Sequence, residues 1–142
     1  MADVTCVILV SNDTLFNGHI EDEILRRVRM GDLHVHVMTP TTSVRSSWTI
    51  SEGAEEVIAT ARIREDIRRL RELGATADGE VVRGHLIEAV QLAVAEHGAS
   101  EVLLSSLAPG ISRMIGMDLP HRLERALTVP VIMVEATDRA HA

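Results

Sequence analysis

Short apolar segments alternate with longer amphipathic segments along the chain, and this alternation limits the fold more than any other feature. The first segment, VTCVILV, is continuously apolar and rich in β-branched residues, which is typical of a strand buried on both faces of a parallel sheet. The apolar segments cover residues 4–10, 33–38, 79–83, 101–106 and 130–135. Strands that alternate with helices predict a five-stranded parallel sheet with helices on both faces, a three-layer α/β/α sandwich.

The segments between these strands have apolar residues at helical spacing. They predict helices over 19–30, 52–73, 85–97 and 119–127. In the second of these, the stretch RIREDIRRLRE interleaves arginines with acids, which indicates a solvated face. The length of 142 residues fits one domain, and we expect residues 1–142 to form it.

Charge and composition exclude several classes of function. A net charge of −7 disfavours nucleic acids and anionic membranes as partners, and an aromatic content of 1% leaves no stacking platform for single strands. All 14 basic residues are arginine, which excludes Schiff-base lysine chemistry and a P-loop lysine. No signal peptide is visible, and no apolar run approaches the roughly 20 residues of a membrane span. We therefore expect a soluble, cytoplasmic protein.

Few side chains suggest catalysis or metal binding. Cys6 has no adjacent cation to activate it and is interpreted as a small buried hydrophobe. His34 and His36 share one face of a strand, but zinc needs three or four ligands and no third is evident nearby. The serines in 105–107 lack a visible base and do not match a nucleophile elbow. We expect neither a metal site nor enzymatic activity.

Four segments carry a family resemblance: VILVSNDT, LHVHVM, GEVVRGHLIEAVQLAVAEHGASEVLLSS and LTVPVIMV. On these segments the chain resembles the universal stress protein family along nearly its whole length. The resemblance implies an adenine nucleotide alpha hydrolase-like fold with strand order 3-2-1-4-5. It also implies frequent dimerisation through the last strand. The apolar edge strand 130–135 offers unpaired backbone groups, so we expect a homodimer through it.

The family's ATP signature, G-x2-G-x9-G-[ST], is not matched after the fourth strand. When the loop is aligned with the family by Gly110 and the PVIMV strand together, the early glycine positions of the signature fall near Leu104 and Leu107, and its final Gly-Ser pair falls near Met117 and Asp118. As an N-cap, Asp118 would accept the N–H groups of the following helix and place a carboxylate where a phosphate would lie. The resemblance therefore predicts a nucleotide cleft that has lost its phosphate chemistry.

The turn after the first strand also departs from the family's Asp-Gly-Ser pattern. Asn12 or Asp13 could take the place of the family's acidic residue and hydrogen-bond a ribose or a base, or the turn could be an Asx turn that closes the strand. Together with Val37 and the loop after the fourth strand, this turn supplies the candidate ligand-binding residues. They are Asn12, Asp13, Thr14, Val37, Ser105, Ser106, Gly110, Ser112, Arg113 and Asp118.

Two functions compete on these grounds. The first is a non-enzymatic, dimeric stress-response domain that acts through a protein partner or a small ligand and has no cofactor. The second is a member that binds ATP or AMP with a variant loop, in which Ser105, Ser106, Ser112 and Arg113 hold the phosphates. A nucleotide hydrolase is the third and least favoured possibility. Fold resemblance alone does not decide between them.

Overall fold

The strands form one parallel sheet. The computed structural model describes residues 4–11, 18–41, 52–105 and 119–134. The strands are β1 (Thr5–Val10), β2 (Leu33–Pro40), β3 (Thr76–Val82), β4 (Glu101–Ser105) and β5 (Val131–Val134). They lie side by side in the order β3-β2-β1-β4-β5, and every neighbouring pair is parallel. The predicted five-stranded parallel sheet and its 3-2-1-4-5 order are confirmed.

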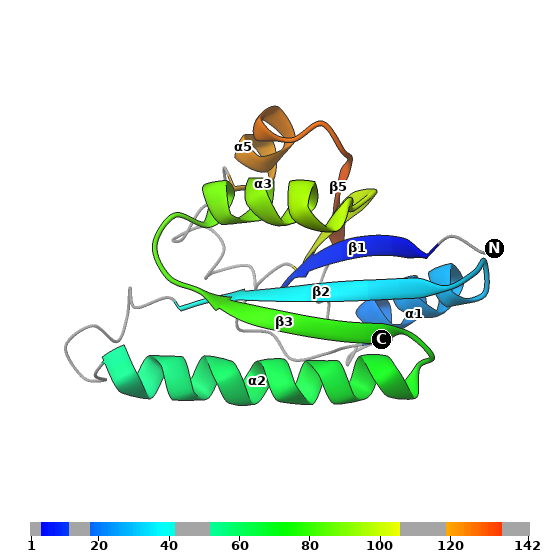
Figure 1. Cartoon of the computed structure of the whole chain (residues 1–142), viewed down its shortest axis with the longest axis horizontal. Helices are drawn as coiled ribbons and strands as arrows, with labels where there is room; N and C mark the ends of the chain where they lie inside the picture. Colours follow the sequence, from blue (N-terminus) through cyan, green and yellow to red (C-terminus); the bar gives the residue numbers. More distant parts are fainter. Residues whose placement is uncertain (1–3, 12–17, 42–51, 106–118, 135–142) are drawn as a thin grey trace, which may run out of the picture.

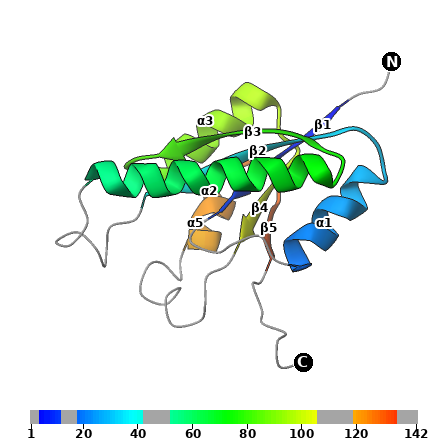
Figure 2. The same ribbon diagram turned by 90° about the horizontal axis from the view of Figure 1, so that it is seen from below.

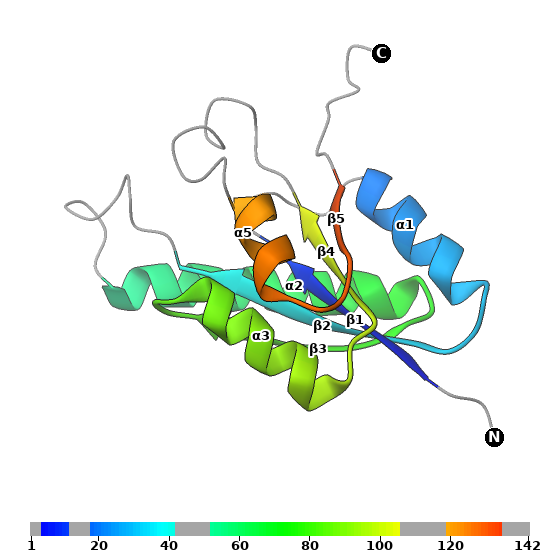
Figure 3. The same ribbon diagram turned by 90° about the horizontal axis from the view of Figure 1, so that it is seen from above.

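Helices cover both faces of this sheet, as the alternating pattern predicts. The described helices are α1 (Gly18–Val28), α2 (Glu52–Glu72), α3 (Leu86–His97) and α5 (Leu119–Ala126). In Figure 1, α2 lies below the sheet and α3 lies above it. The view from below shows α1 and α2 on one face, and the view from above shows α3 and α5 on the other (Figures 2 and 3). The molecule is therefore a three-layer α/β/α sandwich.

The apolar run of β1 supplies side chains to two separate cores. Val7 and Leu9 pack in the core beneath α1 and α2, whereas Ile8 and Val10 pack in the core beneath α3 and α5. All four are at most 2% exposed. Because successive side chains of a strand point to opposite faces, only a continuously apolar strand can fill both cores.

β3 is longer than its sequence suggests. The prediction placed this strand at 79–83, but it runs over Thr76–Val82 and pairs with β2 from His34↔Thr76 onward. Its first three residues were missed because Thr76 and Asp78 are polar. β3 is an edge strand whose α3-side face is partly open, so polar residues are tolerated there.

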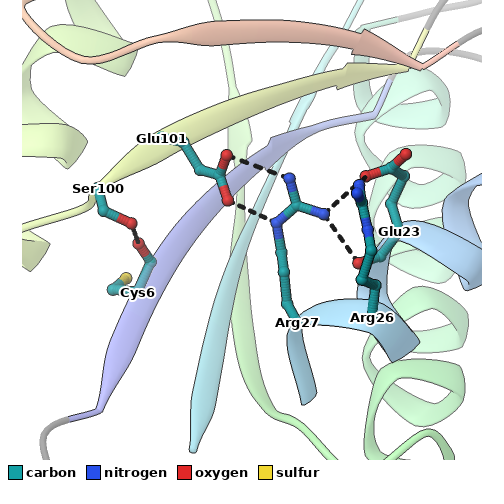
Figure 4. Close-up of polar contacts among 6 residues, drawn as sticks. All are labelled: Cys6, Glu23, Arg26, Arg27, Ser100 and Glu101. Carbon is teal, nitrogen blue, oxygen red and sulfur yellow. Dashed lines mark hydrogen bonds and ion pairs between the residues drawn. The ribbon is translucent and has the colours of Figure 1, made fainter. Parts of the chain in front are cut away.

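An arginine fixes α1 to the start of β4. Arg27 makes a two-pronged contact with Glu101, in which Nη2 donates to Oε1 at 3.1 Å and Nε donates to Oε2, and its Nη1 donates to Glu23 Oε1 at 2.7 Å (Figure 4). Only 13% of the Arg27 side chain and 18% of the Glu101 side chain are exposed. The hydrogen bonds that Arg27 donates to Glu101 raise the pKa of Arg27 despite burial, and the one that Arg27 donates to Glu23 lowers the pKa of Glu23. The contact joins residues 74 positions apart.

Candidate functional site

The strand order reverses direction between β1 and β4. From β1 the chain passes through α1 to β2 on one side, and after β3 it passes through α3 to β4 on the other side. In open α/β sheets, ligands bind outside the carboxyl ends of the strands at such a point. The sequence placed its candidate residues at this end. Val37 and Ser105 are described. The other candidates, Asn12, Asp13, Thr14, Ser106, Gly110, Ser112, Arg113 and Asp118, lie outside the described residues.

Three hydroxyl side chains form a row across this end of the sheet: Ser11, Thr39 and Ser105. Val10 is in register with Met38 of β2 and with Leu104 of β4, so the residue that follows each of them belongs to the same row. Ser11 N donates to Met38 O at 2.9 Å, which continues the pairing of β1 with β2. The three side chains lie on the face covered by α1 and α2, because Val10, Met38 and Leu104 pack in the opposite core.

The hydroxyl row is buried although its members are polar. Ser11, Thr39 and Ser105 are 5%, 1% and 3% exposed. Among the described residues, Thr39 Oγ1 has no hydrogen-bond partner. A buried polar atom without a partner is uncommon in folded proteins, and a bound water or ligand is the usual reason for one. This end of the sheet therefore combines polar groups with an unmet hydrogen-bonding need.

A buried carboxylate on α2 contacts the row. Asp66 is 4% exposed and accepts a hydrogen bond from Ser11 Oγ at 3.3 Å. Burial raises the pKa of Asp66 to about 6, and Glu65 adds to this, whereas the hydrogen bond from Ser11 and the charge of Arg62 act in the opposite direction. A carboxylic acid with such a pKa changes charge near neutral pH, which is common at functional sites.

The sequence interpretation of the α2 charges was wrong for Asp66. The stretch RIREDIRRLRE was assigned to a solvated face, and Arg68 and Glu72 do form an exposed ion pair there. Asp66, however, lies three residues after Ile63 and four before Leu70, and both of these are core residues. Spacing of three and four residues puts all three on one helix face, so the sequence did contain the signal.

Val37 is part of the core beside this site. Its side chain is fully buried in the cluster under α2 that also contains Ile63. The neighbouring strand comes so close that a Cβ added to Gly79 would lie 2.9 Å from Val37 O and 2.8 Å from Ile63 Cγ2. Any contact of Val37 with a ligand stays a prediction. Its observed role is packing.

Three further features of the described residues bear on function: the cysteine, groups that could hold a metal ion, and helices that could cross a membrane. Cys6 is a buried free thiol, as predicted, and burial, followed by the charge of Asp78, raises its pKa away from the reactive range. In the described part of the chain, no group of three or more His, Cys, Asp or Glu side chains is placed to hold a metal ion. None of the helices within the described ranges is long and apolar enough to cross a membrane.

Comparison with known proteins identifies the fold. No protein-family model and no curated protein matches the chain. Several solved structures match the chain. A universal stress protein from Archaeoglobus fulgidus is 12% identical, with a TM-score of 0.65 over 92% of this chain and 93% of that chain. A universal stress protein in complex with cAMP is 14% identical, with a TM-score of 0.62 over 94% and 98% of the two chains.

A third structure extends the comparison to plants. A universal stress protein family member from Arabidopsis thaliana with AMP bound is 13% identical, with a TM-score of 0.61 over 96% of this chain and 94% of that chain. In all three comparisons the match covers almost the whole of both chains, so it includes the complete sheet and its helices. The chain has the universal stress protein fold.

Proposed function

We propose that this protein is a universal-stress-protein-like domain that acts without catalysis, as a homodimer, by binding a small ligand or a protein partner. The observation that carries the proposal is the hydroxyl row of Ser11, Thr39 and Ser105 with Asp66 against it. The row lies at the carboxyl ends of β1, β2 and β4, where this fold class binds ligands. A cytoplasmic location is part of the proposal.

Charge at this end of the sheet supports a cleft that no longer binds phosphates. With a pKa of about 6, Asp66 is mostly ionised at neutral pH and would oppose a phosphate group nearby. The sequence adds to this argument, since Leu104, Leu107, Met117 and Asp118 stand where the ATP signature has glycine or serine. A neutral or cationic ligand with hydrogen-bonding groups fits such an environment better.

The position of β5 supports the homodimer. β5 is the edge strand among the described strands, so one side of its backbone has no neighbour within that part of the sheet. Met133 on this strand is 44% exposed. Pairing of the two edge strands 130–135 around a twofold axis would cover this surface and satisfy the backbone groups.

A second candidate function is AMP or ATP binding through a variant loop. It is supported by the similar structures that contain AMP and cAMP. In this version, Ser105, Ser106, Ser112 and Arg113 would contact the phosphates, and Asn12 or Asp13 would contact the sugar.

Calorimetric titration with AMP and with Mg-ATP separates the two functions. The first predicts no binding heat with either nucleotide at millimolar concentration and no phosphate release from ATP. Micromolar binding that Arg113→Ala weakens would support the second candidate instead. Release of phosphate above that of a buffer blank would overturn the non-catalytic part of the proposal.

A further inference from the structure

A group of histidines and carboxylates lies on the α3-side face of the sheet, away from the hydroxyl row. Figure 1 shows α3 on the side of the sheet opposite α2, so this group is separated from Asp66 by the sheet itself. We refer to it as the histidine cluster. Its members are His34 and His36 of β2, Thr76, Asp78 and Glu80 of β3, and His97 at the end of α3.

Both ring nitrogens of His36 face carboxylate oxygens. Nδ1 lies 2.8 Å from Asp78 Oδ1, and Nε2 lies 2.8 Å from Glu80 Oε2. The His36 side chain is only 6% exposed, whereas the side chains of Asp78 and Glu80 are 54% and 50% exposed, so a buried ring meets two half-exposed carboxylates. An ionised carboxylate accepts hydrogen bonds and donates none, whereas a neutral imidazole has one donor and one acceptor. Both contacts are hydrogen bonds only when His36 carries a proton on each nitrogen.

His34 makes the same number of contacts without this requirement. Its Nε2 lies 3.0 Å from Asp78 Oδ1, and its Nδ1 lies 2.7 Å from Thr76 Oγ1. A threonine hydroxyl can donate as well as accept, so a neutral ring satisfies both contacts when Thr76 donates to Nδ1 rather than to Leu33 O, which lies farther away at 3.4 Å. The two histidines of one strand therefore differ in kind, because only His36 has two acceptor-only partners.

His97 connects the charge of this cluster to α3. Its ring stacks on that of His36 with centroids 4.2 Å apart, and it lies 6.5 Å from the ring of His34. Two positively charged rings at the closer distance would repel, so the stack suits one charged and one neutral ring. From β1, the buried Cys6 thiol also senses the charge of Asp78. The state of His36 thus influences three strands and the last turn of α3.

We propose that the histidine cluster is a proton-operated clamp, in which the doubly protonated ring of His36 holds Asp78 and Glu80 of edge strand β3 against β2. Loss of one proton converts one of the two hydrogen bonds into a contact between two acceptors. The hold on β3 is therefore complete only while His36 carries both protons, and it weakens when one of them is lost.

The acid limit of the clamp is set by Asp78. Burial raises the pKa of this carboxyl, but the hydrogen bonds from His36 and His34 outweigh burial, and the net effect is a lowered pKa. A lowered carboxyl pKa means that its stabilising contribution is present above the pKa of the unfolded chain and is lost as pH falls through the folded value. The clamp therefore requires an ionised Asp78 as well as a doubly protonated His36.

The variant Glu80→Gln tests the clamp with little change of shape. A glutamine amide can donate to an unprotonated Nε2, so His36 no longer needs its second proton. Nitrogen-15 NMR of the histidine rings in the intact chain reports the protonation state directly. At pH 7 we expect the ratio of doubly to singly protonated His36 rings to be about tenfold higher in the wild type than in Glu80→Gln, because a hydrogen bond to a charged group is lost. Glu88→Gln, an exposed change on α3, is the control and should match the wild type.

Hydrogen exchange of the β3 amides measures how firmly β3 is held in the sheet. After correction for the intrinsic pH dependence of exchange, wild-type protection between Thr76 and Val82 should fall about tenfold over the pH range in which the NMR signals show His36 losing a proton. Glu80→Gln should show little change over the same range. A wild-type spectrum with one unprotonated His36 nitrogen at pH 6 overturns the proposal, even if the variant does not fold. Equal pH dependence of exchange in the wild type and Glu80→Gln also overturns it.

Discussion

Ser11 Oγ donates a hydrogen bond to Asp66 Oδ2 over 3.3 Å and joins the end of β1 to the middle of α2. The two residues are 55 positions apart in sequence, and both are at most 5% exposed. One hydrogen bond does not offset the removal of a carboxylate from water, so the pKa of Asp66 rises to about 6. The chain carries a destabilising ionisable group at the end of the sheet where ligands bind in this fold class.

Asp66→Asn should stabilise the protein at neutral pH. A carboxyl pKa that is higher in the folded chain than its value of 3.8 in the unfolded chain means that the folded state binds the proton more tightly. Stability therefore falls as pH rises from about 4 to about 6, and stays lower above that range. Asparagine can still accept from Ser11 but cannot ionise. Urea unfolding at pH 8 should show a gain of up to about 3 kcal/mol, and at pH 4 almost none.

The neighbouring Glu65→Gln is the matched control for this series. Glu65 is exposed and pairs with Arg68, so its replacement should leave the free energy of unfolding almost unchanged at either pH. The free energy of unfolding of the wild type is compared with that of Asp66→Asn at pH 4 and at pH 6. The same difference at both pH values would show that Asp66 ionises normally in the folded chain.

Arg27→Ala should destabilise the protein strongly because it leaves Glu101 without its partner. Both side chains are largely buried, and breaking one partner of such a pair costs about 3 kcal/mol. Arg68→Ala removes an exposed arginine that also contacts two acids, and it should cost much less than Arg27→Ala. Thermal or urea unfolding measures both. Similar losses for the two variants would contradict the anchoring role of Arg27.

Gly79→Ala should destabilise through a steric clash. The added Cβ would meet Val37 O at 2.9 Å, and a backbone oxygen inside a sheet cannot move aside as a side chain can. We expect a loss of about 2 kcal/mol in the free energy of unfolding. At Gly98, nothing lies within 4 Å of an added Cβ, but φ is +63°. Gly98→Ala should therefore lose about 1 kcal/mol, from backbone strain alone. A larger loss for Gly98→Ala than for Gly79→Ala would contradict the close packing of Gly79 against Val37.

Thr39→Val should be neutral or stabilising, although it removes a polar group next to the proposed site. The replacement keeps the shape of the side chain and deletes a buried hydroxyl that lacks a partner among the described residues. A gain of about 1 kcal/mol is expected. Thr76→Val removes a hydroxyl that contacts His34 and should not be stabilising. A loss above 1 kcal/mol for Thr39→Val would show that its hydroxyl is already satisfied.

The sequence predicted what depends on apolar patterning and missed what depends on tertiary position. β1 and β4 were placed to within one residue, because strands buried on both faces must be continuously apolar. The first half of β3 was missed because an edge strand with a partly open face accepts polar residues, and only pairing with β2 reveals it. The order of the strands came from the family resemblance, since alternation alone does not fix it.

The candidate site was predictable in position but not in composition. Parallel strands bring their carboxyl ends to one edge, and Ser105 lies at this edge as the last residue of β4, while its contact with a ligand stays a prediction. Asp66 was assigned to a solvated face, because neighbouring charges outweighed its spacing from Ile63 and Leu70. Thr39 gave no signal, because its burial depends on α2, which is distant in sequence.

Native mass spectrometry of the freshly purified, undialysed protein tests the central claim most directly, since it reports subunit number and bound mass together. The account predicts a dimer without bound nucleotide, and the same mass after addition of Mg-ATP. A dimer that carries the mass of an adenine nucleotide would contradict the loss of phosphate binding, and a protein that stays monomeric would contradict association through β5.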